Sequence, residues 1–188
     1  CHTLGIPMEV VPGPSAAIAA LAISGQHTAR FTFEGFLSVN QNQRMAHLES
    51  LREEMRTMIF YEAPHKLCRT LSDMAAVFGE DRCLSLCREL TKKHETAWQT
   101  TIEDAITRYE QEDPKGECVL VIEGRSQKEI EDEAKAAFEE ISIEEHMKRY
   151  EDQGIARKEA MKLVAKDRGV TKRDIYQYLL GKESYNDF

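Results

Sequence analysis

Apolar and polar positions along residues 6–124 follow two periodicities in alternation. Short apolar runs bounded by turn residues, typical of strands, are followed by stretches whose apolar residues recur every three or four positions, typical of helices. The predicted strands are residues 8–11, 30–37, 58–62, 81–87, 97–100 and 118–122. The predicted helices are residues 16–23, 44–56 and 64–78, and one that starts after Thr101. This alternation predicts an α/β domain with a mixed, mostly parallel sheet flanked by helices.

The pattern changes after Gly124. Residues 126–140 are acidic and predict a linker helix, and three further helical patterns follow at residues 143–152, 157–168 and 171–180. Two short helices around a glycine resemble a helix-turn-helix, but a small packing appendage explains the pattern equally well. We therefore expect an α/β domain over residues 1–125 and a small helical extension over residues 126–188.

The stretch Tyr61-Glu62-Ala63-Pro64-His65 comes directly at the end of a predicted strand. Pro64 is typical of the first turn of a helix. In open α/β sheets, ligands bind outside the carboxyl ends of the strands, so this stretch is a candidate ligand rim. The alternative is a helix-starting proline beside a solvated acid.

Three more polar or turn-forming segments lie next to predicted strands or helices. Pro12-Gly13-Pro14-Ser15 leads into a helix of small residues, whose exposed backbone N–H groups favour an anionic or polar ligand. A plain turn between a strand and a helix would give the same pattern. Residues 88–93 follow another predicted strand, and residues 115–117 precede the apolar run 118–122. Together these rims predict a ligand-binding domain, and the pattern alone goes no further.

The composition excludes several classes of protein. With 188 residues, 41% hydrophobic and 31% charged, the chain can build one sizeable core. Its apolar runs fall well short of the roughly 18 residues that a membrane span needs, and no signal peptide is visible. The five cysteines include no CxxC pair and the six histidines are scattered, so we expect a cytoplasmic protein with reduced thiols and no metal site. Because the chain starts at Cys1, we expect a piece of a longer protein.

The net charge of −8 is unevenly distributed. Residues 1–125 carry 13 basic and 18 acidic side chains, whereas residues 142–182 carry 10 basic and 7 acidic ones. A mildly basic segment attached to an acidic body could contact phosphate groups. An ordinary solvated helical surface has the same balance.

Five segments, in this order, resemble the carboxy-terminal half of the tetrapyrrole-methylase-like family of S-adenosylmethionine-dependent methyltransferases: residues 5–16, 33–37, 59–66, 88–92 and 114–117. The resemblance is closest to the branch that methylates the ribose 2′-hydroxyl of a cytidine in bacterial 16S ribosomal RNA. The helical tail around residues 160–165 is similar to that branch's extension. In this family two α/β domains hold the cofactor between them, and nothing in this chain matches the first domain.

The resemblance implies roles for individual residues. It implies S-adenosylmethionine contacts for Ser15, Ala16, Tyr61, Glu62, Leu90, Lys115, Gly116 and Glu117. Arg88, Lys92 and Lys93 are candidates for contacts with RNA phosphates. Methyl transfer to a hydroxyl needs a base, and the base is left open between Glu62, Glu89 and His65. The loop 38–44 departs from the proline- and lysine-rich pattern of the branch, so its contact with RNA is in doubt.

The expected activity is therefore 2′-O-methylation of a cytidine ribose on the small ribosomal subunit, by a homodimer. This chain alone is expected to be inactive and to bind S-adenosylmethionine weakly. A methyltransferase of the same fold that acts on tetrapyrroles, or on a diphthine-type protein histidine, is one alternative. A regulator of another class, with a DNA-binding tail over residues 142–182 and an α/β body that senses a small molecule, is a second alternative.

Overall fold

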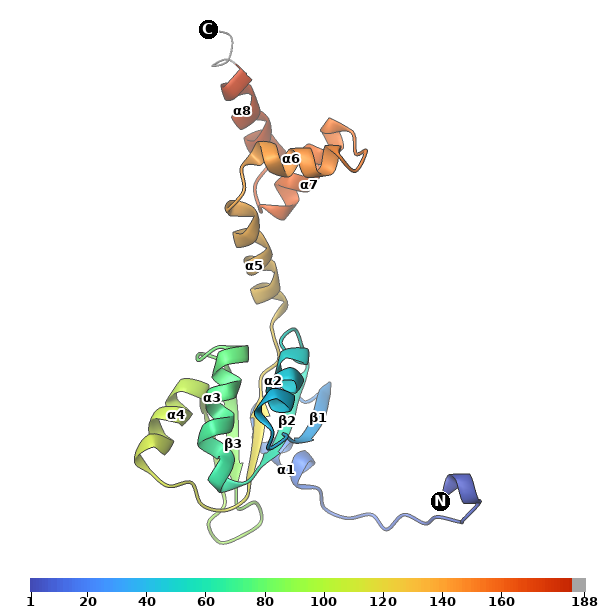
Figure 1. Cartoon of the computed structure of the whole chain (residues 1–188), viewed down its shortest axis with the longest axis vertical. Coiled ribbons are helices and arrows are strands. Elements are labelled where there is room, and N and C mark those ends of the chain that lie inside the picture. Colours follow the sequence, from blue (N-terminus) through green and yellow to red (C-terminus); the bar gives the residue numbers. More distant parts are fainter. Residues whose placement is uncertain (184–188) are drawn as a thin grey trace. The chain divides into compact units, whose positions relative to one another are not determined.

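The computed structural model describes residues 1–183. The chain divides into two compact units, the first formed by residues 1–125 and the second beginning at Ser126 (Figure 1). No helix in the described part of the chain is long and apolar enough to cross a membrane.

A five-stranded sheet lies at the centre of the first unit, and its strands have the order β1-β2-β5-β3-β4. Figure 1 labels β1, β2 and β3. The strands are β1 (Phe31–Phe36), β2 (Thr57–Glu62), β3 (Cys83–Arg88), β4 (Thr96–Thr101) and β5 (Cys118–Ile122). The predicted α/β class is confirmed. The expectation of a mostly parallel sheet is wrong: β1 and β2 pair in parallel, whereas the β2–β5, β3–β5 and β3–β4 pairs are antiparallel.

The connections explain the antiparallel pairs. Residues 89–95 join β3 to β4, and a parallel neighbour would need a crossover of a dozen residues or more. The strand β5 returns after a helix and enters the sheet between β2 and β3, against the direction of both. The order of elements along the chain was therefore predictable, but their order within the sheet was not.

The predicted rims meet at one edge of this sheet. The strands β1, β2 and β3 run in the same direction, so their carboxyl ends lie at the same edge. The strand β5 starts from that edge, because its first residue, Cys118, pairs with both Glu62 and Arg88. The segments 61–65, 88–93 and 115–117 consequently lie around the same edge.

Three helices cover one face of the sheet: α2 (Gln41–Ser50), α3 (Leu67–Phe78) and α4 (Ile102–Gln111), with the short 3₁₀ turn η2 (Pro64–Lys66) leading into α3. Their apolar residues pack on Phe60, Leu86 and Leu120, which are all at most 1% exposed. Burial of such side chains stabilises the fold by about 1.5–3 kcal/mol each. This face is the main core of the unit.

The opposite face carries the single described helix α1 (Ala16–Ile23). Its small residues Ala17 and Ala20 allow the helix to lie close to the sheet. The carbonyl oxygen of Ser24, at the end of the helix, accepts hydrogen bonds from Ser85 Oγ and Gln99 Nε2, each at 2.6 Å. These two bonds fix the carboxyl end of α1 on the sheet.

One predicted strand is absent from the described part of the chain, and one predicted helix has different bounds. Residues 6–15 form no strand in the described structure and are exposed, because the apolar run at residues 8–11 meets no sheet edge. Near it, η1 (His2–Leu4) is a single 3₁₀ turn. The helix predicted at residues 44–56 begins earlier, at Gln41, because the Asn40 side chain accepts a hydrogen bond from the Gln43 N–H and caps it. It also ends earlier, at Ser50.

The second unit contains the four predicted helices, α5 (Gln127–Glu139), α6 (Ile143–Glu151), α7 (Arg157–Asp167) and α8 (Lys172–Glu183). Ser126 and Glu129 form a capping box at the start of α5. Met147, Ala160, Val164 and Ile175 form a small core between α6, α7 and α8.

Candidate functional site at the carboxyl edge of the sheet

Tyr61, the predicted rim residue at the end of β2, joins two of the predicted segments. Its hydroxyl oxygen accepts a hydrogen bond from the backbone N–H of Ala17 at 3.0 Å. This contact places the start of α1, with the exposed residues Ser15 and Ala16, beside the end of β2. The first N–H groups of a helix have no partner within the helix, so Tyr61 satisfies one of them.

Two aromatic residues that the sequence analysis did not single out complete this surface. The ring of Tyr61 lies 5.0 Å from that of Phe33 and 5.5 Å from that of Phe36, centroid to centroid. The register of β1 shifts between Phe33 and Gly35, where Gly35 has a φ of 67°, and this bulge puts both phenylalanines beside Tyr61. Phe33 is 53% exposed and Phe36 is 65% exposed. The aromatic alternation of residues 31–36 was the available signal.

Leu90 belongs to the same side of the sheet. It is half-buried and, like Tyr61, packs against the core cluster formed by α1 and the sheet. The structure thus brings together Ser15, Ala16, Tyr61 and Leu90, which come from three predicted segments. We call the surface formed by Ser15, Ala16, Phe33, Phe36, Tyr61 and Leu90 the aromatic wall.

Glu89, Gly116 and Glu117 form a tight contact between two turns at this edge. The Glu89 N–H donates to the Glu117 carbonyl oxygen at 3.3 Å, and the Glu117 N–H donates to Glu89 Oε1 at 3.3 Å. A Cβ atom on Gly116 would lie 2.4 Å from Glu89 Oε1, and the φ of Gly116 is 77°. Only glycine fits at this position without displacing Glu89.

The carboxylate of Glu89 is a poor candidate for a base. Lys92 Nζ donates to Glu89 Oε1 at 3.1 Å and lies 3.7 Å from Glu117 Oε2. The hydrogen bond from Lys92 lowers the pKa of Glu89, and a lower pKa makes its carboxylate a weaker proton acceptor. Lys92, predicted to contact RNA, has its charge balanced by these two carboxylates.

Glu62 holds a turn. It is 3% exposed, its Oε2 accepts a hydrogen bond from Thr70 Oγ1 at 2.6 Å, and its Oε1 accepts one from the Ala63 N–H at 2.8 Å. Its position in β2 alternates with that of Tyr61, so its side chain lies on the helix-covered face rather than on the aromatic wall. These contacts disfavour the predicted role of Glu62 in catalysis or cofactor binding.

The remaining predicted residues are distributed around the edge. His65, in η2, is exposed, and so is Lys93. Arg88 Nη1 donates to the Tyr109 hydroxyl at 3.3 Å, on the side of α4. Arg88 and Lys115 line a hollow of about 380 Å³ there, together with Arg108, Glu112 and Asp113.

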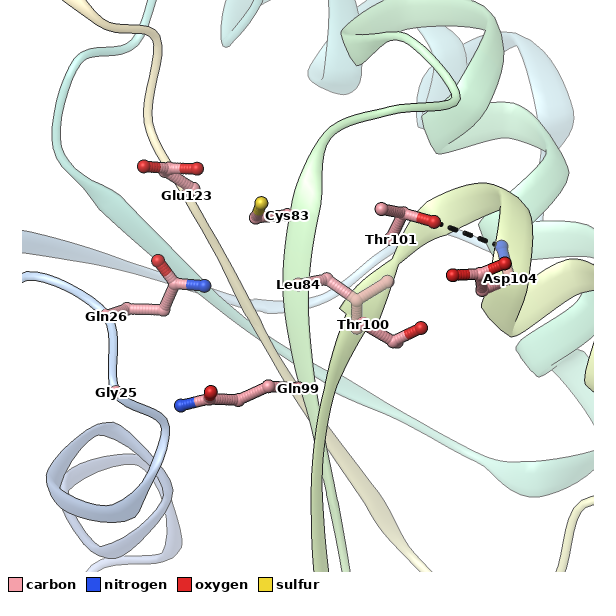
Figure 2. A pocket seen from close by; sticks show the side chains of 9 residues that line it. All are labelled: Gly25, Gln26, Cys83, Leu84, Gln99, Thr100, Thr101, Asp104 and Glu123. Carbon is pink, nitrogen blue, oxygen red and sulfur yellow. Dashed lines mark hydrogen bonds between the residues drawn. The ribbon is translucent and has the colours of Figure 1, made fainter.

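A second depression, of about 400 Å³, lies at the other edge of the sheet, where β4 and β5 end (Figure 2). The side chains of Gln26 and Gln99 extend into it, and Cys83 faces Glu123 (Figure 2). Partial burial and a hydrogen bond to Glu123 raise the pKa of Cys83, so its thiol stays protonated at neutral pH. No sequence pattern pointed to this depression. Among the described residues, no group of three or more His, Cys, Asp or Glu could hold a metal ion.

Comparison with known protein families decides how this edge is interpreted. The family model for tetrapyrrole (corrin/porphyrin) methylases matches residues 1–106. The chain belongs to this family. Its resemblance to the tetrapyrrole methylases, noted from five sequence segments, is thereby confirmed.

The tetrapyrrole methylase relatives of this chain carry a more specific name. This chain is 39% identical over 184 residues to ribosomal RNA small subunit methyltransferase I of Synechocystis sp. The match covers 98% of this chain and 64% of that protein. The chain is 43% identical over 172 residues to the protein of the same name from Halalkalibacterium halodurans, covering 92% of this chain and 58% of that protein. The chain thus spans less than two thirds of the length of these relatives.

A solved structure supports the fold. The crystal structure of the methyltransferase CobJ matches with a TM-score of 0.50 at 20% identity, over 66% of this chain and 54% of that one. At this level of identity the match shows the tetrapyrrole methylase fold alone.

Tetrapyrrole methylases use S-adenosylmethionine. The aromatic wall fits one side of this cofactor: half-buried Tyr61 and Leu90 offer apolar contacts for an adenosine, beside the exposed residues Ser15 and Ala16 at the start of α1. Cofactor sites bury most of their ligand, whereas Phe33 and Phe36 on this wall remain more than half exposed. The described residues therefore fit one wall of a cofactor cleft rather than a complete one.

Proposed function

We propose that this chain is the carboxy-terminal part of an S-adenosylmethionine-dependent methyltransferase that methylates the ribose 2′-hydroxyl of a cytidine in 16S ribosomal RNA. The observation that carries the proposal is the convergence of the predicted rims at one sheet edge, beside an aromatic wall that is only half covered. The two relatives named as ribosomal RNA small subunit methyltransferases support the choice of substrate.

The aromatic wall would hold the adenosine side of the cofactor, through Tyr61, Leu90 and the backbone around Ser15 and Ala16. Bound S-adenosylmethionine would supply an electrophilic methyl group, whose transfer depends mainly on in-line positioning of the acceptor hydroxyl. The turns at Glu89 and at Gly116-Glu117 would close the edge of this site, since Glu89 and Glu117 are fixed to each other by two hydrogen bonds.

His65 is our first candidate for the group that accepts the hydroxyl proton. Glu62 is buried with both carboxylate oxygens engaged, and Glu89 is paired with Lys92. His65 is exposed in the turn that follows β2, and histidine is a common general base in enzymes. Replacing His65 by alanine in the full-length protein should lower kcat for methyl transfer and leave cofactor affinity unchanged.

The proposal includes a further α/β domain in the longer protein, which would supply the other wall of the cleft. The relatives are longer than this chain, and the aromatic wall is uncovered in it, which supports this arrangement. We accordingly propose that residues 1–188 alone are inactive and bind S-adenosylmethionine weakly. Tight calorimetric binding to this chain alone would contradict that.

Small ribosomal subunits are the proposed partner, and the cytoplasm, where they are assembled, is the proposed compartment. A homodimer is proposed as well, and the molar mass of the full-length protein in solution, measured by light scattering, tests it. A mass equal to that of one chain would contradict the dimer.

The test of the proposed reaction is an assay of the full-length protein with S-adenosylmethionine labelled in its methyl group. Small subunits that lack the modification should take up the label. Uptake by a tetrapyrrole precursor or by diphthine-type protein substrates, with none in ribosomal RNA, would favour the other activities of this fold. Sequence-selective binding of duplex DNA without methyl transfer would favour a regulator.

A further inference from the structure

A basic hollow lies at the same edge of the sheet as the aromatic wall, but on the other face. It has a volume of about 380 Å³ and is lined by three cationic residues, Arg88, Arg108 and Lys115, and by two acidic ones, Glu112 and Asp113. Arg88 is the last residue of β3, and Lys115 lies just before β5, so the hollow adjoins the same edge of the sheet as Tyr61. We call this set of five residues the basic hollow.

Arg108 is held in place before any ligand binds. Its guanidinium carbon lies 4.7 Å from the centre of the Trp98 ring and 5.9 Å from that of Tyr109. Its Nε donates to Glu112 Oε2 at 3.3 Å, across one turn of α4. A guanidinium stacked on an indole loses little further freedom when it binds an anion, because its plane is already fixed.

Arg88 has one nitrogen, Nε, without a hydrogen-bond partner among the described residues. Its Nη1 donates to the Tyr109 hydroxyl, while its Nε is buried. An unpaired buried donor on a charged group is costly. An anion in the hollow would lower this cost by balancing the charge of the Arg88 guanidinium.

The net charge of the basic hollow favours an anionic ligand. Three cations and two carboxylates leave the basic hollow with one net positive charge, which matches the single negative charge of a phosphodiester. S-adenosylmethionine carries no phosphate, and its proposed site is the aromatic wall on the other face of the sheet. The nearby Lys92 is less suited, because Glu89 and Glu117 already balance its charge.

We propose that the basic hollow binds a backbone phosphate of the substrate RNA, at the sheet edge that also carries the aromatic wall. This inference rests on the proposed function and deepens it. It assigns Arg108, which no motif indicated, as an RNA contact, and it gives Lys115 a phosphate contact in place of the cofactor contact expected for it. Phosphate contacts fix the register of a nucleic acid without reading its sequence.

The test compares three single variants of the full-length protein. Arg108→Gln and Lys115→Gln remove a charge from the basic hollow. Arg56→Gln is the matched control, since Arg56 is an exposed cation paired with a carboxylate, Glu54, at the opposite end of β2. Filter binding to 16S ribosomal RNA over a range of salt concentrations gives the affinity and its salt dependence, and calorimetry gives the affinity for S-adenosylmethionine.

Each basic-hollow variant should weaken RNA binding roughly tenfold at low salt and reduce the slope of log affinity against log salt by about one. The control should keep the wild-type values, and all variants should bind S-adenosylmethionine as the wild type does. In methyl transfer, KM for the subunit should rise while kcat changes little.

Three results would overturn the inference. If the wild type binds RNA and both basic-hollow variants behave like Arg56→Gln, the phosphate site is wrong and the proposed function stands. If the wild type neither binds nor methylates ribosomal RNA, the proposed function fails and the phosphate site fails with it. Inorganic phosphate serves as a probe of a free-anion site: if it competes with RNA in the wild type and in neither variant, the hollow is the phosphate site, and if it competes equally in all, the site lies elsewhere.

Discussion

The hydroxyl of Tyr61 accepts a hydrogen bond from the backbone N–H of Ala17, although the two residues are 44 positions apart in the chain. This bond joins the carboxyl end of β2 to the amino end of α1. Two segments that are distant in the sequence therefore form one continuous surface. Because the ring of Tyr61 also contacts Phe33 and Phe36, its position is fixed by two other elements, α1 and β1.

Replacing Tyr61 by phenylalanine tests this bond. The ring contacts remain, but the Ala17 N–H loses its acceptor, so the free energy of unfolding should fall by about 1 kcal/mol. Denaturant titration, followed by the fluorescence of Trp98 in the same unit, measures it. The matched control is Tyr176→Phe, since Tyr176 is 52% exposed on α8. Equal stability of Tyr61→Phe and the wild type would contradict the assigned role.

Gly116 is predicted to be irreplaceable in the contact with Glu89. Alanine at this position would adopt an unfavourable φ of 77° and place its Cβ within 2.4–2.7 Å of three Glu89 atoms. Gly116→Ala should therefore lower the free energy of unfolding by about 2 kcal/mol.

The control is Gly13→Ala, because a Cβ on Gly13 would meet nothing within 4 Å. The double variant Gly116→Ala with Glu89→Ala separates the two causes: it removes the steric contact and leaves the φ penalty, so it should recover part of the loss. No recovery would show that Glu89 does not occupy the position described.

We predict that Glu62 stabilises the folded protein and takes no part in methyl transfer. Glu62→Ala leaves the Thr70 hydroxyl and the Ala63 N–H without their acceptor in a buried site, so the free energy of unfolding should fall by about 2–3 kcal/mol. Methyl transfer by the full-length variant, measured well below its melting temperature, should stay within a few-fold of the wild type. A loss of several orders of magnitude in kcat at unchanged stability would make Glu62 catalytic.

His146 gives the helical unit a dependence on pH. Its side chain is 1% exposed and stacks on Phe138 at 4.3 Å. Arg168 Nε donates to its Nδ1 at 3.2 Å, and its Nε2 lies 3.4 Å from Asp167 Oδ2, which also accepts from the Tyr150 hydroxyl. An Nδ1 that accepts a hydrogen bond cannot carry a proton, so this geometry holds the ring neutral.

Burial first, and then the charge of Arg168, lower the pKa of His146 below its ordinary value of 6.5. Below pH 6.5 the unfolded chain therefore binds more protons than the folded one, and stability falls with pH until the folded pKa is passed. Hydrogen-exchange protection of α6 amides should decrease over that window and be constant above it. His146→Phe should remove this dependence, whereas His94→Gln, at an exposed histidine, should keep it. Protection that rises as the pH falls would contradict the geometry.

Most of the helices and strands, and the segments that form the candidate site, could be predicted from the sequence. The contacts between these segments could not. Periodicity placed all five strands of the sheet within about two residues. The strands β2 and β5 are apolar runs because they are buried, and β1 alternates aromatic with other residues. The periodicity could not show that β5 inserts between β2 and β3, since pairing depends on which edges are free in space. The same limit hid the partners of Glu62 and Glu89, whose contacts come from turns and helices elsewhere in the chain. It also produced a false strand at residues 8–11, where an apolar run has no neighbour.

The most direct test of the central claim is the chemical identity of the methylated nucleoside. Small subunits that lack the modification are incubated with the full-length protein and S-adenosylmethionine, and the 16S ribosomal RNA is digested to nucleosides for mass spectrometry. The account predicts 2′-O-methylcytidine. A methyl group on a base, or ribosomal RNA without any new methyl group, would contradict it.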